Sequence, residues 1–337
     1  MNYTQQQLDT FKTAIDEAQH IMVMQAERID ADSLGSSLGL EAALTKLGKQ
    51  VTLFAYDEVP NYLRHMPGWD RVTSNIPNNY DIAILVDSST INQLERTWAD
   101  HKGTITKRPL FCLDHHASTT GQLEGENIIL MVDDEAGASG QQVTELAQHF
   151  GWEIDAEGAY ALASAIKADT VNLATKKVSS DTFAAMGHLV ECGADLEQLR
   201  YNIEQSSSIT PADLPLKATG LQRVQFFKDE QIAITYFTQE EYESLGEDQL
   251  VIERMKQDLR MIKGVEVSVT ITERKGYSNA SMRANIDVAR KTAEHFGGGG
   301  HDRAASCRFF EADHKQVIEQ IVPKLSELID EQNAKAV

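Results

Sequence analysis

A chain of 337 residues is long enough to form two domains with separate hydrophobic cores. It carries 51 acidic against 31 basic residues, and its formal charge of −20 argues against binding long duplexes through a basic surface. The first residues contain no basic segment followed by an apolar one, and no apolar run approaches the roughly 20 residues that span a bilayer. With three isolated cysteines as well, we expect a cytoplasmic protein with reduced thiols, no signal peptide and no membrane contact.

Strands alternate with helices through the first part of the chain. The apolar runs predict strands at 20–24, 49–55, 81–86, 109–113 and 127–132. Helical spacing of apolar residues predicts helices at 4–18, 34–47, 140–150, 156–167, 180–192 and 195–205. This alternation predicts an α/β domain over residues 1–205, built on a parallel sheet.

A polar, serine-rich segment that ends at Pro211 predicts a linker over 206–215. Beyond it the order of the elements changes. Strands are predicted at 224–227, 232–237, 265–272 and 280–284, and helices at 239–246, 248–262 and 287–295. The first two strands flank a short polar turn and read as a hairpin. We therefore expect a smaller α+β domain over 216–337, with a mixed or antiparallel sheet.

Carboxylates and imidazoles follow three of the buried strands of the first domain. In an open α/β sheet, ligands collect at the carboxyl ends of parallel strands, so these side chains are expected to lie together. They are Asp30 and Asp32 after the first strand, Asp87 after the third, and Asp114, His115 and His116 after the fourth. Asp169, at the end of a predicted helix, is a further carboxylate.

Each of these carboxylates has a structural explanation when it is taken alone. Asp32 with Ser33 could cap the predicted helix, Asp87 could form a strand-end turn, and Asp169 could simply end a helix. Taken together they favour a metal centre, because oxygen-rich ligation with one or two imidazoles suits Mn²⁺ or Mg²⁺ better than Zn²⁺. Two such ions about 3.5–4 Å apart would support phosphoester hydrolysis.

A run of four glycines, 297–300, precedes His301 in the second domain. Residues without Cβ let a backbone approach a ligand closely, and successive N–H groups can hold an anion. The run could equally be a flexible helix terminator. Arg283, on a predicted strand, could contact phosphate through its guanidinium fork, or could be a surface charge.

The Asp-His-His triplet at 114–116 and the glycine-rich segment 297–301, followed by Ala304-Ala305, together resemble the signatures of the DHH family of phosphoesterases. The resemblance covers most of the chain. It implies a Rossmann-like, parallel-sheet DHH domain followed by a smaller DHH-associated domain. It also implies an active site in the cleft between the two domains.

The resemblance further implies the roles of individual residues. It implies two Mn²⁺ ions, with Mg²⁺ as the alternative, held by Asp30, Asp32, Asp87, His115 and Asp169. His116 would help catalysis, and Asp114 would orient it. The terminal nucleotide of the substrate would be gripped by Arg283, Gly298, Gly299, Gly300 and His301.

One position departs from the family pattern. The metal-binding histidine that precedes the first aspartate by four residues is replaced here by Ala26, which cannot bind metal. Loss of even a partner of a metal ligand costs about 10–100-fold in affinity or activity. Three explanations stay open: an engineered substitution, a natural centre in which water or Glu27 takes the place of the histidine, or a decayed enzyme.

Within the family, the chain is most similar to the short, two-domain group that degrades nanoRNA and dephosphorylates adenosine 3′,5′-bisphosphate (pAp). We therefore expect hydrolysis of very short oligonucleotides or small nucleotide phosphates by a water that two metals activate. The alternative is a nucleotide-binding or regulatory protein that has lost turnover, which Ala26 favours. Expected partners are short single strands or nucleotide bisphosphates, not long duplexes, and analogy suggests a homodimer.

Overall fold

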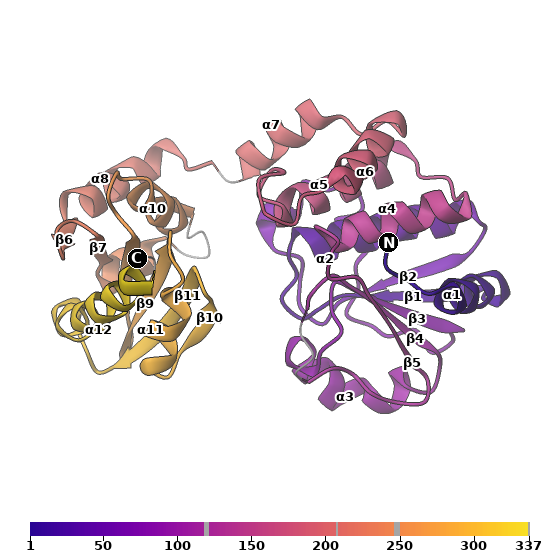
Figure 1. Cartoon of the computed structure of the whole chain (residues 1–337), viewed down its shortest axis with the longest axis horizontal. Coiled ribbons are helices and arrows are strands. Elements are labelled where there is room, and N and C mark those ends of the chain that lie inside the picture. The colour runs from indigo at the N-terminus through magenta and orange to yellow at the C-terminus, as the bar shows by residue number, and fades with distance from the viewer. Residues whose placement is uncertain (118–120, 207, 246–249, 336–337) are drawn as a thin grey trace. The chain divides into compact units, whose positions relative to one another are not determined.

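The structure, a computed structural model, describes residues 1–337 except 118–120, 207, 246–249 and 336–337, and not the side chains of His301 and Lys335. The chain divides into two compact units, 1–206 and 207–337, each with its own sheet (Figure 1). Two helical elements, η4 (Pro211–Asp213) and the start of α8 (Leu214–Gln222), occupy much of the segment that we expected to be a linker.

The first unit is built on a five-stranded sheet in which every neighbouring pair is parallel. Its strands are β1 (His20–Met24), β2 (Gln50–Phe54), β3 (Ile82–Val86), β4 (Leu110–Asp114) and β5 (Ile128–Val132). The spatial order is β2-β1-β3-β4-β5, so the chain reverses direction across the sheet between β1 and β3. The predicted α/β fold with a parallel sheet is confirmed.

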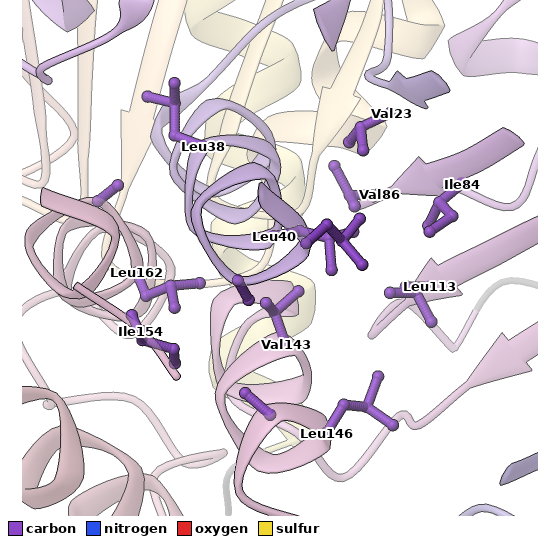
Figure 2. Close-up of a cluster of buried hydrophobic side chains, with 14 of the residues drawn as sticks. Val23, Leu38, Leu40, Ile84, Val86, Leu113, Val143, Leu146, Ile154 and Leu162 are labelled. Carbon is purple, nitrogen blue, oxygen red and sulfur yellow. The ribbon is translucent and has the colours of Figure 1, made fainter. Parts of the chain in front are cut away.

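Helices cover both faces of this sheet. They are α1 (Gln5–Glu17), α2 (Ala31–Lys46), α3 (Glu95–Ile105), α4 (Ser139–Phe150), α5 (Ala156–Asp169), α6 (Ser180–Glu191) and α7 (Leu196–Ser206). Three short 3₁₀ segments are η1 (Asn61–Leu63), η2 (Trp69–Arg71) and η3 (Ile91–Gln93). On one face, Val23, Ile84 and Leu113 pack with α2 and α4 (Figure 2). On the other face, Met22 and Cys112 pack against α3.

Helix α2 begins three residues earlier than the sequence predicted. The Asp30 carboxylate accepts a hydrogen bond from the Ser33 amide, and the Ser33 hydroxyl accepts one from the Asp30 amide, which together form a capping box. The expectation that Asp32 caps a helix starting at Leu34 is therefore wrong. Asp32 lies inside the first turn of α2 and is fully buried.

Helices α2 and α5 pack with almost no space between their backbones. A Cβ at Gly35 would stand 2.4 Å from the carbonyl oxygen of Ala161, and a Cβ at Gly39 would stand 2.2 Å from Leu162 Cγ. Only glycine fits at such a close approach. Because α2 carries Asp32 and α5 ends at Asp169, this contact also fixes the separation of two candidate ligands.

We expect Gly35→Ala to destabilise the protein by about 1–3 kcal/mol, since the added methyl group forces the two helices apart. Gly103→Ala is the matched control, because Gly103 lies in α3 with open space around its Cβ position. There the better helix propensity of alanine should stabilise by about 0.5–1 kcal/mol. Urea unfolding followed by circular dichroism measures both, and equal effects would contradict the proposed close packing.

The second unit is built on a six-stranded mixed sheet in the order β10-β11-β9-β8-β7-β6. Its strands are β6 (Gln225–Phe227), β7 (Ile232–Phe237), β8 (Val267–Arg274), β9 (Tyr277–Ala284), β10 (Gly299–His301) and β11 (Ala304–Phe310). Only β7 and β8 pair in parallel. The predicted smaller α+β domain with a mixed sheet is confirmed, although β10 and β11 were not predicted.

Helices pack on both faces of this second sheet as well. They are α9 (Gln239–Ser244), α10 (Leu250–Arg260), α11 (Ala289–His295) and α12 (His314–Lys335). Helices α11 and α12 cover an apolar face that includes Val269, Met282 and Cys307. Helix α10 packs on the opposite face near Ala233 and Phe237. None of the helices in the described part of the chain combines the length and apolar composition that crossing a bilayer requires.

Candidate metal centre

The carboxyl ends of β1, β3 and β4 meet at one edge of the parallel sheet. Between β1 and β3 the order of the strands reverses, which is where open α/β sheets bind their ligands. Asp87 follows β3 directly, Asp114 is the last residue of β4, and His115 comes next. Asp32 enters the same place from the start of α2, which follows β1.

Three carboxylates converge on the imidazole of His115. Its Nε2 lies 3.5 Å from Asp32 Oδ2, 3.4 Å from Asp87 Oδ1 and 3.0 Å from Asp169 Oδ2. The His115 side chain is only 4% exposed, and neither of its ring nitrogens has a hydrogen-bond partner of good geometry among the described residues. There are two sets of residues in each of which the potential ligand atoms all lie within 4.8 Å of one another. One set is Asp87, His115 and His116, and the other is Asp32, His115 and Asp169.

The pKa values of the carboxylates and of the imidazole in this cluster are shifted by burial and by the charges of their neighbours. Burial raises the pKa of Asp32 to about 6, with a further contribution from Asp169. Burial and the nearby Asp32 raise the pKa of Asp87 well above its ordinary value. Burial alone would lower the pKa of His115, but the carboxylates of Asp169, Asp87 and Asp32 raise it to about 11. Buried carboxylates this close require a compensating cation, so the donor set fits a divalent ion.

Asp87 adopts a left-handed backbone conformation, with φ of 59°. Aspartate tolerates this region better than most residues, but it still carries a cost on the order of 1 kcal/mol. The amide of Asp87 donates to the carbonyl of Leu113 at 2.8 Å, which holds the turn against β4. The Ser139 hydroxyl also donates to Asp87 Oδ1 at 3.3 Å. Backbone strain of this kind is concentrated at functional sites.

Asp32 joins helix α2 to the N-terminus of α4. Its carboxylate accepts hydrogen bonds from the amides of Ser139 and Gly140, at 2.7 and 2.9 Å, and from the Ser36 hydroxyl at 3.1 Å. The positive end of a helix stabilises a negative charge at this position. These hydrogen bonds favour the ionised form of the Asp32 carboxylate and fix its position in the cluster.

His116 and Asp114 form a hydrogen-bonded pair beside the cluster. His116 Nδ1 lies 2.7 Å from Asp114 Oδ1, and the Ser89 hydroxyl donates to Asp114 Oδ2. Burial tends to raise the pKa of Asp114, but these hydrogen bonds from His116 and Ser89 outweigh it and hold the pKa below its usual value. Asp114 therefore stays ionised and fixes the His116 ring, which is half exposed, with Nδ1 as the donor.

Asp30 is placed differently from the other predicted ligands. It is exposed, caps α2 and belongs to neither of the two sets of potential ligand atoms. After burial and Asp32, Asp30 also contributes to the raised pKa of Asp87, so it lies close enough to act on the cluster electrostatically. Its role as a metal ligand stays a prediction.

Ala26 is buried, at 6% exposure, just past the end of β1. The neighbouring Glu27 is not free to replace a missing ligand. Its carboxylate accepts hydrogen bonds from the Thr97 amide at 2.7 Å and from Arg96 Nε at 2.9 Å. Of the three explanations for Ala26, the one in which Glu27 binds the metal is therefore disfavoured.

The glycine-rich segment has a packing role that the sequence analysis missed. A Cβ at Gly298 would stand 2.2 Å from the Ser306 carbonyl oxygen, and one at Gly300 would stand 2.6 Å from the Ala304 carbonyl oxygen. The backbone here approaches strand β11, with which β10 pairs. Nothing lies within 4 Å of a Cβ at Gly299, so packing does not explain that glycine.

The remaining predicted substrate contacts lie in the second unit. Arg283 is partly exposed, at 27%, and its guanidinium lies 3.3 Å from Glu253 Oε2. The side chain of His301 lies outside the described residues, so its predicted contact is not placed. A contact that sequence reasoning missed is in the first unit, where Lys177 Nζ donates to the carbonyl oxygen of His115 at 2.9 Å. Lys177 carries no local motif that would have identified it.

Comparisons with known proteins agree with this geometry. Residues 20–168 match the DHH family, N-terminal domain. The chain is 25% identical over 301 residues to the bifunctional oligoribonuclease and PAP phosphatase NrnA of Thermus thermophilus, which covers 88% of this chain and 86% of that protein.

Two solved structures show the same fold. An exopolyphosphatase-related protein from Bacteroides fragilis is similar with a TM-score of 0.84 and 21% identity, over 97% of this chain and 98% of that one. RecJ of Thermus thermophilus in complex with Mn²⁺ is similar with a TM-score of 0.50 and 13% identity, over 96% of this chain and 54% of RecJ. Both similarities concern the fold.

We expect Asp87→Asn to weaken Mn²⁺ binding by about 10-fold or more, because an amide is a poorer ligand than a carboxylate for a hard cation. Titration calorimetry on the purified chain measures the affinity. Asp134→Asn, which changes an exposed aspartate on the loop after β5, is the control and should leave it unchanged. Equal affinity in wild type and Asp87→Asn would remove Asp87 from the metal centre.

Proposed function

This chain carries a DHH family N-terminal domain over residues 20–168, and from this premise we propose that it is a metal-dependent phosphoesterase. Its substrates would be very short oligonucleotides or small nucleotide phosphates. The family predicted from the sequence motifs is confirmed. The observation that carries the proposal is the convergence of Asp32, Asp87 and Asp169 on His115, at the point of the sheet where ligands bind.

The substrate class is supported by the relative from Thermus thermophilus. That protein is named an oligoribonuclease and PAP phosphatase, and its alignment runs over most of both chains. Both activities hydrolyse a phosphoester next to a nucleoside. We infer the same chemistry for this chain, with single-stranded or mononucleotide substrates, because its net charge of −20 does not suit a long duplex.

The donor set would hold two divalent ions, Mn²⁺ or Mg²⁺, through Asp32, Asp87, His115 and Asp169. Asp30 would be a further ligand. When bound, such ions would ligate phosphate oxygens, lower the pKa of the attacking water and offset negative charge on the phosphoryl oxygens. Asp32, anchored on the α4 amides, would keep this arrangement rigid as the substrate arrives. Rigid supporting contacts of this kind keep a catalytic site in its productive geometry.

His116 would move the proton that the reaction requires. Its Nδ1–H is directed at Asp114, which leaves Nε2 to donate a proton to the leaving oxygen or to accept one from the water. Asp114 would not take the proton itself, because its hydrogen bonds with His116 and Ser89 lower its pKa. Its role would be to hold the ring in one orientation and tautomer.

A second candidate function is a nucleotide-binding or regulatory protein without turnover. Ala26 favours it, since the residue that would hold the family's metal-binding histidine is a buried alanine and Glu27 is engaged elsewhere. The rest of the predicted donor set is present, and the structure brings four of its five members to one place. A drifting site would have lost more, so we favour the enzyme.

A turnover assay on the full chain with Mn²⁺ tests the proposal against its alternative. Substrates are pAp, a ribodinucleotide and cyclic di-AMP, and the expected products are inorganic phosphate from the first and mononucleotides from the second. Excess EDTA should abolish product formation. Mn²⁺-dependent binding of pAp without product would favour the binding protein, and absence of both binding and product would remove both functions.

Ala26→His should raise Mn²⁺ affinity and increase dinucleotide hydrolysis by at least roughly 10-fold, since it restores a ligand at the family position. Because Ala26 is buried, the imidazole must displace its neighbours, so we also expect a lower melting temperature. Ala26→Leu has a similar volume without a ligand, and serves as the control. A gain in metal binding without a gain in turnover would favour the binding protein, and a gain in neither would mean that position 26 does not face the metals.

Arg283→Ala should raise KM for a dinucleotide by about 10-fold or more while leaving Mn²⁺ affinity unchanged, because the guanidinium would contact substrate phosphate and not metal. Glu253→Gln, which removes the partner of Arg283, is the informative comparison. It should lower KM or leave it unchanged. An unaffected KM in Arg283→Ala would mean that this residue is a solvated surface charge.

A further inference from the structure

Strands β9 and β11 expose a polar face whose role is not explained by Arg283 alone. Alternate residues of a strand share one face, and the antiparallel register places Tyr277 opposite Phe310 and Asn279 opposite Arg308. The residues between them, such as Cys307 and Phe309, are buried under α11 and α12. We call the outward set the β9–β11 strip, and it consists of Tyr277, Asn279, Ser306, Arg308 and Phe310.

Aromatic rings and guanidinium groups are stacked at one end of this strip. The guanidinium of Arg308 lies 5.3 Å from the centre of the Tyr277 ring. Arg274, at the end of β8, lies 4.2 Å from the Tyr242 ring and 5.9 Å from the Tyr277 ring. Phe310 lies beside Tyr277 at 6.2 Å and is 74% exposed. An exposed phenylalanine next to stacked guanidinium groups forms a flat, cationic platform.

Carboxylates of the described residues do not neutralise the cations at this end of the strip. In the described part of the chain no ion pair involves Arg274, Lys275 or Arg308, although acidic residues outnumber basic ones by 51 to 31. Other arginines of the same unit are paired, as Arg290 is with Asp302. A cluster of unpaired positive charge on an acidic protein indicates a negatively charged ligand.

The combination of a stacking platform with unpaired cations matches the chemistry of single-stranded nucleic acid. Bases stack on aromatic rings and on arginine planes, while basic side chains follow the phosphates. The Ser306 hydroxyl and the Asn279 amide along the strip can bond to sugar and base edges. An apolar protein partner would leave these polar groups and the guanidinium charges desolvated.

The distance between the aromatic end of the strip and Arg283, the predicted phosphate contact, is longer than one nucleotide. Arg283 and Tyr277 occupy the two ends of the same strand face, six positions apart, which corresponds to roughly 20 Å. A mononucleotide bound at Arg283 therefore does not reach Phe310, whereas an oligonucleotide of a few residues does.

We propose that the β9–β11 strip binds the bases of a single-stranded oligonucleotide beyond the nucleotide held at Arg283. The strip thereby gives longer substrates an affinity that mononucleotides lack. This inference rests on the proposed function and deepens it, because it assigns substrate-length preference to named residues of the second unit. The Phe310 ring stacks on a base, and Arg308 and Arg274 neutralise adjacent phosphates.

The test compares substrates of different length in Phe310→Ala and Arg308→Ala. Each variant should raise KM for a ribotetranucleotide by roughly 5–10-fold or more, the loss expected for one stacked base, and change KM for pAp by less than twofold. Phe310→Trp should restore the tetranucleotide value. Phe183→Ala, which removes a 57% exposed phenylalanine from the first unit, should have no effect.

A binding measurement without turnover tests the strip independently of the proposed phosphoesterase activity. Fluorescence anisotropy of a labelled tetranucleotide, in RNA and DNA form and in EDTA, reports the strip without turnover. Weaker binding by Phe310→Ala supports the strip even if wild type hydrolyses none of the substrates tested. Unchanged binding and unchanged KM in Phe310→Ala and Arg308→Ala overturn the inference, and a change only in the sedimentation coefficient would make the strip an interface between copies.

Discussion

The burial of several carboxylates around one imidazole is the constraint on which the first unit depends. Taking these charges out of water is costly unless a cation and hydrogen bonds compensate them. The α4 amides stabilise the Asp32 carboxylate with two hydrogen bonds. The remaining negative charge calls for a compensating cation, and the donor set fits a divalent ion.

That packing couples stability to the metal centre. Gly35 allows α2 and α5 to approach closely, and these helices carry Asp32 and Asp169. Asp87 sits in a left-handed conformation that the β4 backbone holds in place. The candidate ligands are therefore positioned by helix–helix and strand–strand contacts of the core rather than by flexible loops. Such support is what a site requires when its geometry must persist before the metal and the substrate arrive.

The second unit differs from the first in the charge of its candidate functional surface, which is cationic and not acidic. Its glycine-rich segment brings β10 against β11, and its arginines line the outward face of the sheet. Cationic groups such as Arg308, which has no carboxylate partner among the described residues, suit a ligand that carries its own negative charge.

The sequence by itself determined the α/β fold, the family and the Asp-His-His triplet at 114–116. These follow from apolar strand runs and from residues that lie next to one another in the chain. It pointed to Asp32 as a helix cap, whereas the structure places the cap at Asp30, because helix α2 already begins at Ala31. Only the tertiary structure brought Asp169 and Asp32 to His115, since they lie on different helices far apart in the chain. The tertiary structure also showed that Gly298 and Gly300 pack against strand β11. The sequence did not predict this contact, because β11 has no apolar run that would have identified it as a strand.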